Sequence, residues 1–167
     1  MNQKTRKIVI SALMASAVCV ATMIIKIPSP MKGYLNLGDC IVLLCGWLLG
    51  PVYGFAAAGL GSALADLFAG YVTYVPATFV IKGAMALVAW GFLVLMGKKS
   101  KKHFAQIVGG FVAEVVMVLG YFVFEGFLYG FAPSVVNIPA NCAQGVAGLV
   151  IGVILIKLLE KAKITVD

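Results

Sequence analysis

The stretch GYLNLGDCIVLLCGWLLGPVYGFAAAGLGSALADLFAGYVTYVPATFVIKG, residues 33–83, decides the fold class. It is almost entirely apolar, yet it contains Asn36, Asp39, Asp66 and Lys82. Charged groups inside apolar segments are costly in a lipid bilayer, and they commonly mark a binding site. The stretch therefore predicts membrane-spanning helices whose ends and walls carry functional polar groups.

The composition of the whole chain indicates an integral membrane protein. The 167 residues are 62% hydrophobic and 11% charged, whereas soluble domains are about 45–50% apolar and about 25% charged. The length favours a single membrane domain over residues 1–167. The net charge is +7, and most of the basic residues lie in three short clusters, a pattern that indicates membrane topology and contact with lipid and does not indicate a nucleic-acid partner.

Apolar runs predict an all-α bundle of six transmembrane helices. They cover residues 8–27, 37–49, 51–69, 76–96, 104–124 and 139–159. The second helix is short: at 1.5 Å per residue it reaches only about 20 Å, so we expect the residues before it to enter the protein. The alternative is a surface loop beside a strongly tilted helix.

Basic residues predict the orientation of these helices. The three clusters are Lys4, Arg6 and Lys7; Lys98, Lys99, Lys101 and Lys102; and Lys157, Lys161 and Lys163. Because cytoplasmic loops carry an excess of Lys and Arg, six crossings place all three clusters and both termini in the cytoplasm. The first apolar run exceeds the about 7–15 residues of a signal-peptide core, so we interpret it as a retained helix.

Polar residues near the outer ends of the helices form the predicted substrate-binding site. They are Asn36, Asp39, Asp66, Tyr74, Lys82, Glu114, Tyr121, Glu125, Asn137, Asn141 and Gln144. Amides offer both hydrogen-bond donors and acceptors, and tyrosine rings offer stacking surface. This mixture favours a compact aromatic ligand that is neutral or weakly charged. For Asn141 and Gln144, hydrogen bonding between helices is an alternative role.

The charged residues of this set also have structural alternatives. Asp39 follows a turn at a helix start, where a carboxylate caps free N–H groups. Asp66 could pair with Lys82 or with a loop amide, and Lys82 could extend its ammonium group toward the membrane surface. Glu114 lies too deep in its helix to reach the membrane surface, which favours a functional role. A structural ion pair with Lys82 is the alternative.

Several classes of site are not indicated by the sequence. It contains no GxxxxGK[ST] phosphate loop, so we expect any ATPase to be another chain. Cys19, Cys40, Cys45 and Cys142 lie in apolar runs and are expected to be small buried hydrophobes. His103 has no acidic neighbour in the sequence. We therefore expect no metal, no cofactor and no enzymatic activity.

Three segments carry a family resemblance. NLGD (residues 36–39), LLGPVYGFAAAGLGSALADL (48–67) and GYVTYVPATFVIKG (70–83) resemble the S components of energy-coupling factor (ECF) vitamin transporters. Within that family, the three segments are most similar to the subgroup that includes the hydroxymethylpyrimidine, pyridoxine and riboflavin S components. The resemblance implies a six-helix bundle in the plasma membrane of a prokaryote that binds a vitamin from outside with high affinity. It also implies delivery by an ATP-driven module of a transmembrane T subunit and two cytoplasmic ATPases.

The resemblance assigns further roles. Family members dock to the T subunit through an Ala-xxx-Ala pattern in the first helix, which Ala17 and Ala21 match, with Ala12 and Ser16 as an imperfect alternative. Internal packing is the competing role for these small residues. The loop PSPMKGYLNLG, residues 28–38, corresponds to the family's gate over the ligand.

The substrate implied is a vitamin B6 vitamer or hydroxymethylpyrimidine, with riboflavin second. The alternative to an S component is a stand-alone secondary transporter, although the sequence shows no convincing inverted repeat.

Overall fold

The computed structural model describes residues 2–28, 34–97 and 101–163. Its elements are α1 (Gln3–Ile24), β1 (Ile27–Pro28), β2 (Tyr34–Leu35), α2 (Gly38–Phe68), α3 (Val75–Met96), α4 (Lys102–Tyr129), α5 (Phe131–Ser134), the 3₁₀ turn η1 (Val135–Asn137) and α6 (Ile138–Lys161). The predicted all-helical class is confirmed. Within the described residues, five helical segments are long and apolar enough to cross a membrane: Gln3–Ile24, Gly38–Phe68, Val75–Met96, Lys102–Tyr129 and Phe131–Lys161.

The helix α2 consists of two helical arms joined by a sharp turn at Gly50. That residue has φ 77° and ψ −169°, outside the helical region, and Pro51 follows it. Glycine adopts positive φ without a Cβ penalty, and proline suits the first turn of the next helix. A Cβ atom at Gly54 would lie only 2.7 Å from the carbonyl oxygen of Cys45, so the two arms lie against each other. The first arm (residues 38–49) and the second arm (residues 51–68) correspond to the second and third predicted helices.

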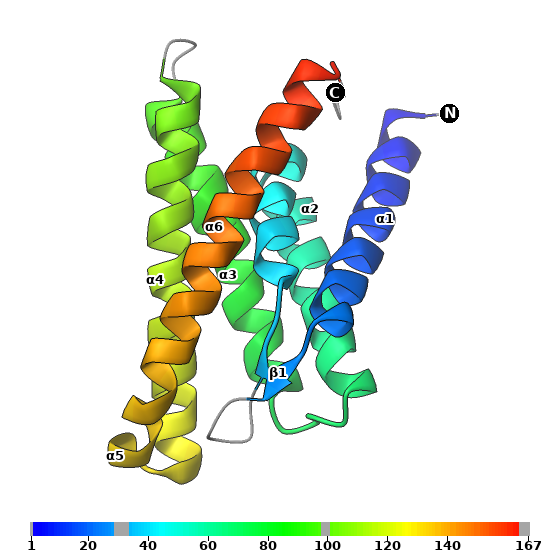
Figure 1. Ribbon diagram of the computed structural model, residues 1–167. Helices are drawn as coiled ribbons and strands as arrows, with labels where there is room; N and C mark the ends of the chain where they lie inside the picture. The colour runs from blue at the N-terminus through cyan, green and yellow to red at the C-terminus, as the bar shows by residue number, and fades with distance from the viewer. Residues whose placement is uncertain (1, 29–33, 98–100, 164–167) are drawn as a thin grey trace.

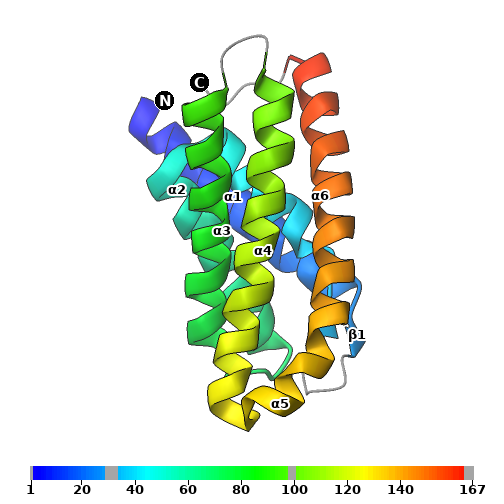
Figure 2. The ribbon, with the colours of Figure 1, turned by 90° about the vertical axis from the view of Figure 1, so that its left-hand side faces the viewer.

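The helices form a layered bundle. In Figure 2, α3, α4 and α6 lie in front of α2 and α1, and α3 and α6 both contact α4. Figure 1 places both chain ends at one end of the bundle, with β1 and α5 at the other. Close packing depends on glycine: a Cβ at Gly46 would lie 2.3 Å from the Ala86 carbonyl oxygen, and one at Gly61 would lie 2.3 Å from that of Ala15.

The helix ends differ from those predicted. The helix α1 ends at Ile24 instead of residue 27, because Ile27 and Pro28 pair with Leu35 and Tyr34 in a short antiparallel ladder. The helix α4 continues to Tyr129, beyond the expected residue 124, and stops at Gly130 with φ 93°. Such short strands have no periodicity that a sequence pattern could reveal.

The cysteines divide into two groups. Cys19, Cys40 and Cys45 are buried as expected, whereas Cys142 is exposed, so the prediction for Cys142 was wrong. Its neighbour Val146, one turn along α6, is also exposed. A small apolar thiol suits a lipid-facing helix surface as well as a protein core, and composition alone does not separate these two environments.

Candidate functional site

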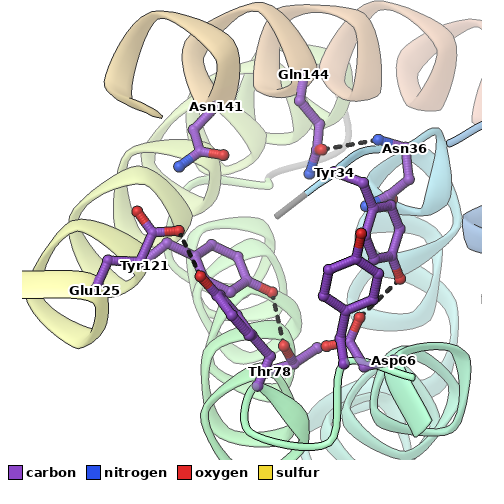
Figure 3. A pocket seen from close by; sticks show the side chains of 10 residues that line it. Tyr34, Asn36, Asp66, Thr78, Tyr121, Glu125, Asn141 and Gln144 are labelled. Atoms are coloured by element: carbon purple, nitrogen blue, oxygen red, sulfur yellow. Dashed lines mark hydrogen bonds between the residues drawn. The ribbon is translucent and has the colours of Figure 1, made fainter. Parts of the chain in front are cut away.

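A pocket lies between the helices close to the β1–β2 ladder. Its cavity volume is about 40 Å³, and the wider space between its walls, about 420 Å³, includes open solvent. Its lining residues come from β2, the turn before α2, the loop between α2 and α3, and the helices α2, α3, α4 and α6 (Figure 3). They are Tyr34, Asn36, Asp66, Tyr71, Tyr74, Thr78, Tyr121, Glu125, Asn141 and Gln144.

The structure divides the predicted substrate-binding residues into two sets. Those that line the pocket are Asn36, Asp66, Tyr74, Tyr121, Glu125, Asn141 and Gln144. Asp39, Lys82, Glu114 and Asn137 are buried outside the lining. The sequence analysis did not select Tyr34, Tyr71 or Thr78. Thr78 had a usable signal, because it lies four residues after Tyr74 and four before Lys82 and so shares their helix face.

A buried polar network lies behind the pocket and joins three helices. Lys82 forms an ion pair with Asp39 Oδ1, and both side chains are buried. Gln144 Nε2 donates to Asp39 Oδ2 at 2.6 Å, and Gln144 Oε1 accepts from the backbone N–H of Asn36 at 2.9 Å. Both ends of the Gln144 amide are therefore engaged within the protein. This amide positions the segment before α2 against α6.

The network corrects four of the structural alternatives. Lys82 pairs with Asp39 and not with Asp66 or Glu114, and its buried ammonium group does not extend to the surface. The residue that accepts from the free N–H of Gly38 is Asn36, at 2.9 Å, and not Asp39. Asp39 faces the bundle interior because α3 and α6 supply its cation and its amide donor there.

Asp66 forms one acidic wall of the pocket. Tyr34 donates its hydroxyl to Asp66 Oδ1 at 2.7 Å, and its ring lies 4.9 Å from that of Tyr71. Burial raises the pKa of Tyr34, and the nearby Asp66 charge adds to this, so the hydroxyl remains a donor at neutral pH. These contacts fasten the β2 segment to the C-terminal end of α2.

Glu125 forms the other acidic wall. Asn137 Nδ2 lies 3.0 and 2.9 Å from its two carboxylate oxygens, and the Tyr74 hydroxyl donates to Oε1 at 3.3 Å. Asn137 therefore contributes to the site by holding Glu125 in place, although it does not line the pocket. The contacts tie α3, α4 and the approach to α6 together at the pocket mouth.

Asn141 differs from Gln144 although both lie on α6 and line the pocket. Within the described residues Asn141 has no hydrogen-bond partner, and its amide points into the cavity in Figure 3. On the facing side, the hydroxyls of Thr78 and Tyr121 lie 3.0 Å apart. The ring of Tyr74 lies 6.5 Å from that of Tyr121. The pocket thus offers a free amide opposite an aromatic surface.

Glu114 does not line this pocket. It is 5% exposed, and neither of its carboxylate oxygens has a hydrogen-bond partner among the described residues. A Cβ atom at Gly148 would lie 3.0 Å from Glu114 Oε1 and 2.7 Å from Asp39 Cβ, so Glu114 lies close to the Asp39–Lys82 pair. An apolar groove between α4 and α6 lies on its other side.

We expect Glu114→Met to stabilise the protein. A buried polar group without a partner costs about 1–3 kcal/mol, and methionine of similar length removes that cost. The matched variant Glu125→Met is expected to destabilise the protein, because it removes the acceptor shared by Asn137 and Tyr74. Thermal unfolding in detergent measures both. A lower unfolding temperature for Glu114→Met would show that its carboxyl has a stabilising partner.

The small residues of α1 lie on different sides of that helix. Ala12 and Ser16 are exposed, whereas Ala17 and Ala21 are half-buried. The helix packs on α2 through a third side, where Ala15 and Val18 meet Gly61. Ala12 and Ser16 therefore remain available on the outer face of the bundle.

No metal centre is found in the parts of the chain that the structure describes: they contain no group of three or more His, Cys, Asp or Glu side chains that could hold a metal ion.

Comparisons with known proteins agree in the type of protein that they find. A family model described as "ECF-type riboflavin transporter, S component" matches residues 2–161. An uncharacterised protein of Pyrococcus woesei is 38% identical over 137 residues, which are 81% of this chain and 89% of the relative. The thiamine precursor transporter HmpT of Lactococcus lactis subsp. cremoris is 24% identical over 98% of this chain and 93% of its own length.

Two solved structures have the same fold. One is the S component of a bacterial ECF transporter, with a TM-score of 0.78, 22% identity and coverage of 96% of this chain and 99% of that one. The other is an S component for biotin from an ECF-type ABC transporter, with a TM-score of 0.61, 22% identity and coverage of 93% of each chain. At this level of identity the two structures establish the fold alone.

Proposed function

The chain belongs to the family of ECF-type riboflavin transporter S components, and from this premise we propose that its pocket receives a small aromatic vitamin from outside the cell. An S component is a substrate-binding part of a transporter and not an enzyme; it binds a vitamin for uptake and works with a T subunit and an ATPase module. The observation that carries the proposal is the free Asn141 amide, which faces tyrosine rings in a pocket whose other amides and carboxylates are hydrogen-bonded within the protein.

We propose that the single membrane domain of residues 1–167 crosses the membrane six times. The crossings are α1, the first and second arms of α2, α3, α4 and α6. The N-terminal and C-terminal lysines lie at one end of the bundle, and the positive-inside rule assigns that end to the cytoplasm. The pocket lies toward the opposite end and would open outward. The membrane is then the plasma membrane of a prokaryote, with both termini cytoplasmic.

The favoured substrates are hydroxymethylpyrimidine and the vitamin B6 vitamers. The similarity to a thiamine precursor transporter supports the first, and a compact pocket with one free amide suits a single substituted ring. Riboflavin is the second candidate, favoured by the description of the family model. Residues 29–33 of the proposed gate loop lie outside the described residues. The described residues 34–38 of that loop contribute Tyr34 and Asn36 to the pocket.

We expect Asn141→Ala to weaken vitamin binding without affecting folding. The variant removes a hydrogen bond that only the ligand can make, which is worth about 1–3 kcal/mol, or roughly 5- to 150-fold in affinity. Isothermal titration of the purified chain measures the loss. The control is Asn141→Gln, which keeps both the donor and the acceptor of the amide without adding a charge and is expected to lose less affinity. Unchanged affinity in Asn141→Ala would show that Asn141 does not bind the vitamin.

Reconstitution tests the transport role. In proteoliposomes, the chain alone is expected to bind the vitamin without accumulating it, because no ATPase motif is present in the sequence. Accumulation is expected only when a T subunit, two ATPases and ATP are added. Accumulation by the chain alone under an ion gradient would instead identify a stand-alone secondary transporter.

A further inference from the structure

The acidic groups of the pocket lack the ion pairs that Asp39 and Glu160 form. Asp39 is paired with Lys82, and Glu160 forms an ion pair with Lys102 at 2.9 Å. Within the described residues, neither Asp66 nor Glu125 forms an ion pair, although the charges of Lys82 and Lys26 act on Asp66 from farther away. The hydrogen-bond donors to these carboxylates are neutral: the Tyr34 and Thr78 hydroxyls for Asp66, and an amide and a tyrosine hydroxyl for Glu125.

Cations near the pocket are already engaged or lie outside its lining. Lys82 is 3% exposed and bound to Asp39, and Lys26 lies 5.8 Å from the centre of the Tyr34 ring. Among the described residues that line the pocket, none is Lys, Arg or His. The lining therefore carries two carboxyl groups and no opposite charge. Removing carboxylates from water without a counter-charge is costly, and a ligand that supplies the charge recovers part of that cost.

We propose that the pocket selects an aromatic heterocycle that carries a positive charge, on a protonated amine or on the ring, over neutral and anionic relatives of the same shape. The inference rests on the proposed function and narrows it: among the substrates named there, it ranks ligands with an amine, such as pyridoxamine, above hydroxymethylpyrimidine and pyridoxine. Tyrosine rings line the same space, and their faces attract cations as well as stack on flat rings. The carboxylates and the tyrosine rings therefore both favour a positively charged ligand.

The arrangement of the walls also indicates how such a ligand would lie. Figure 3 places Glu125 and Asp66 on separate sides of the cavity, with Asn141 directed between them. The ring would lie against the tyrosines, its charged group would reach one carboxylate, and Asn141 would bond to the ring edge. Gln144 would contribute only shape, because Asp39 and Asn36 already occupy its amide.

Matched ligand pairs test the charge preference directly. In each pair one ring carries CH₂NH₃⁺ in one member and CH₂OH in the other: pyridoxamine against pyridoxine, and 4-amino-5-aminomethyl-2-methylpyrimidine against its 5-hydroxymethyl analogue. Titration of the purified full chain is expected to show roughly tenfold or tighter binding of the amine in at least one pair. This comparison requires no variant, so a folding defect cannot obscure it.

Variants then assign the preference to residues. Either Asp66→Asn or Glu125→Gln is expected to reduce the amine preference to within about threefold. The control is Glu160→Gln, which removes a carboxylate that pairs with Lys102 on α4 and does not line the pocket; it should leave the preference intact. A preference that persists in both pocket variants would overturn the assignment to these carboxylates.

The outcomes separate this inference from the proposed function. Equal binding within each pair, a preference for the hydroxymethyl member, or tight binding of riboflavin or biotin with neither amine bound would overturn the charge selection and leave the vitamin-binding role intact. If neither member of either pair binds, and riboflavin and biotin do not bind either, both the charge selection and the proposed pocket are contradicted.

Discussion

Replacing Lys82 by methionine is expected to destabilise the protein by about 3–5 kcal/mol, because the variant leaves Asp39 as a buried carboxylate without its cation. Asp39 is fully buried, and only the Gln144 amide would remain bonded to its side chain. Glu114 lies beside the pair, so the variant would also leave two acidic groups together in the bundle interior. Thermal and denaturant unfolding in detergent would show the loss.

A double variant separates loss of the pair from loss of packing. Lys82→Met combined with Asp39→Asn is expected to recover much of the stability, because no buried charge is then left unpaired. Lys157→Met removes an exposed lysine from α6 and serves as the matched control, with little change expected. If Lys82→Met and Lys157→Met have equal stability, the ion pair does not hold the bundle together.

Replacing Ser16 by tryptophan is expected to stop uptake while leaving vitamin affinity unchanged. Ser16 and Ala12 lie on the exposed face of α1, one turn apart, where a large ring would block close approach of another membrane helix. Ser16 is not among the pocket-lining residues, so binding should not change. ATP-driven uptake in proteoliposomes and titration of the isolated chain measure the two effects separately.

Variants at the other small residues distinguish the two proposed docking pairs. Ala17→Trp and Ala21→Trp place the ring at half-buried positions, so they should disturb packing as well as docking. Val150→Trp, on the exposed face of α6, is the control for a bulky lipid-facing ring and should retain uptake. Normal uptake by Ser16→Trp would show that the face with Ala12 and Ser16 does not dock to the T subunit. Docking would then be assigned to Ala17 and Ala21.

Much of the fold could be predicted from sequence because its signals are local. The Gly50–Pro51 pair correctly divided two helical segments, and the long apolar runs placed the other helices within a few residues of their observed positions. The four-residue helix α5 and the β1–β2 ladder were missed, because elements this short leave no periodic pattern.

The site was predicted less completely, because position along a helix does not determine which neighbour a side chain faces. Glu114 is deep in α4 as expected, but it faces Gly145 and Gly148 and not the pocket. Asn141 and Gln144 have the same chemistry and nearly the same depth, yet only Gln144 is bonded to Asp39. That difference depends on contacts between residues about 100 positions apart, which no local pattern encodes.

Native mass spectrometry of the detergent-purified chain, with a panel of riboflavin, pyridoxine, pyridoxal, pyridoxamine, hydroxymethylpyrimidine, thiamine and pantothenate, tests the vitamin-binding role most directly. The prediction is a complex of one vitamin with one chain, formed without ATP or partner subunits and weakened by Asn141→Ala. No complex with any vitamin in the panel, or a complex that Asn141→Ala leaves unchanged, would contradict binding in the pocket between α2, α3, α4 and α6.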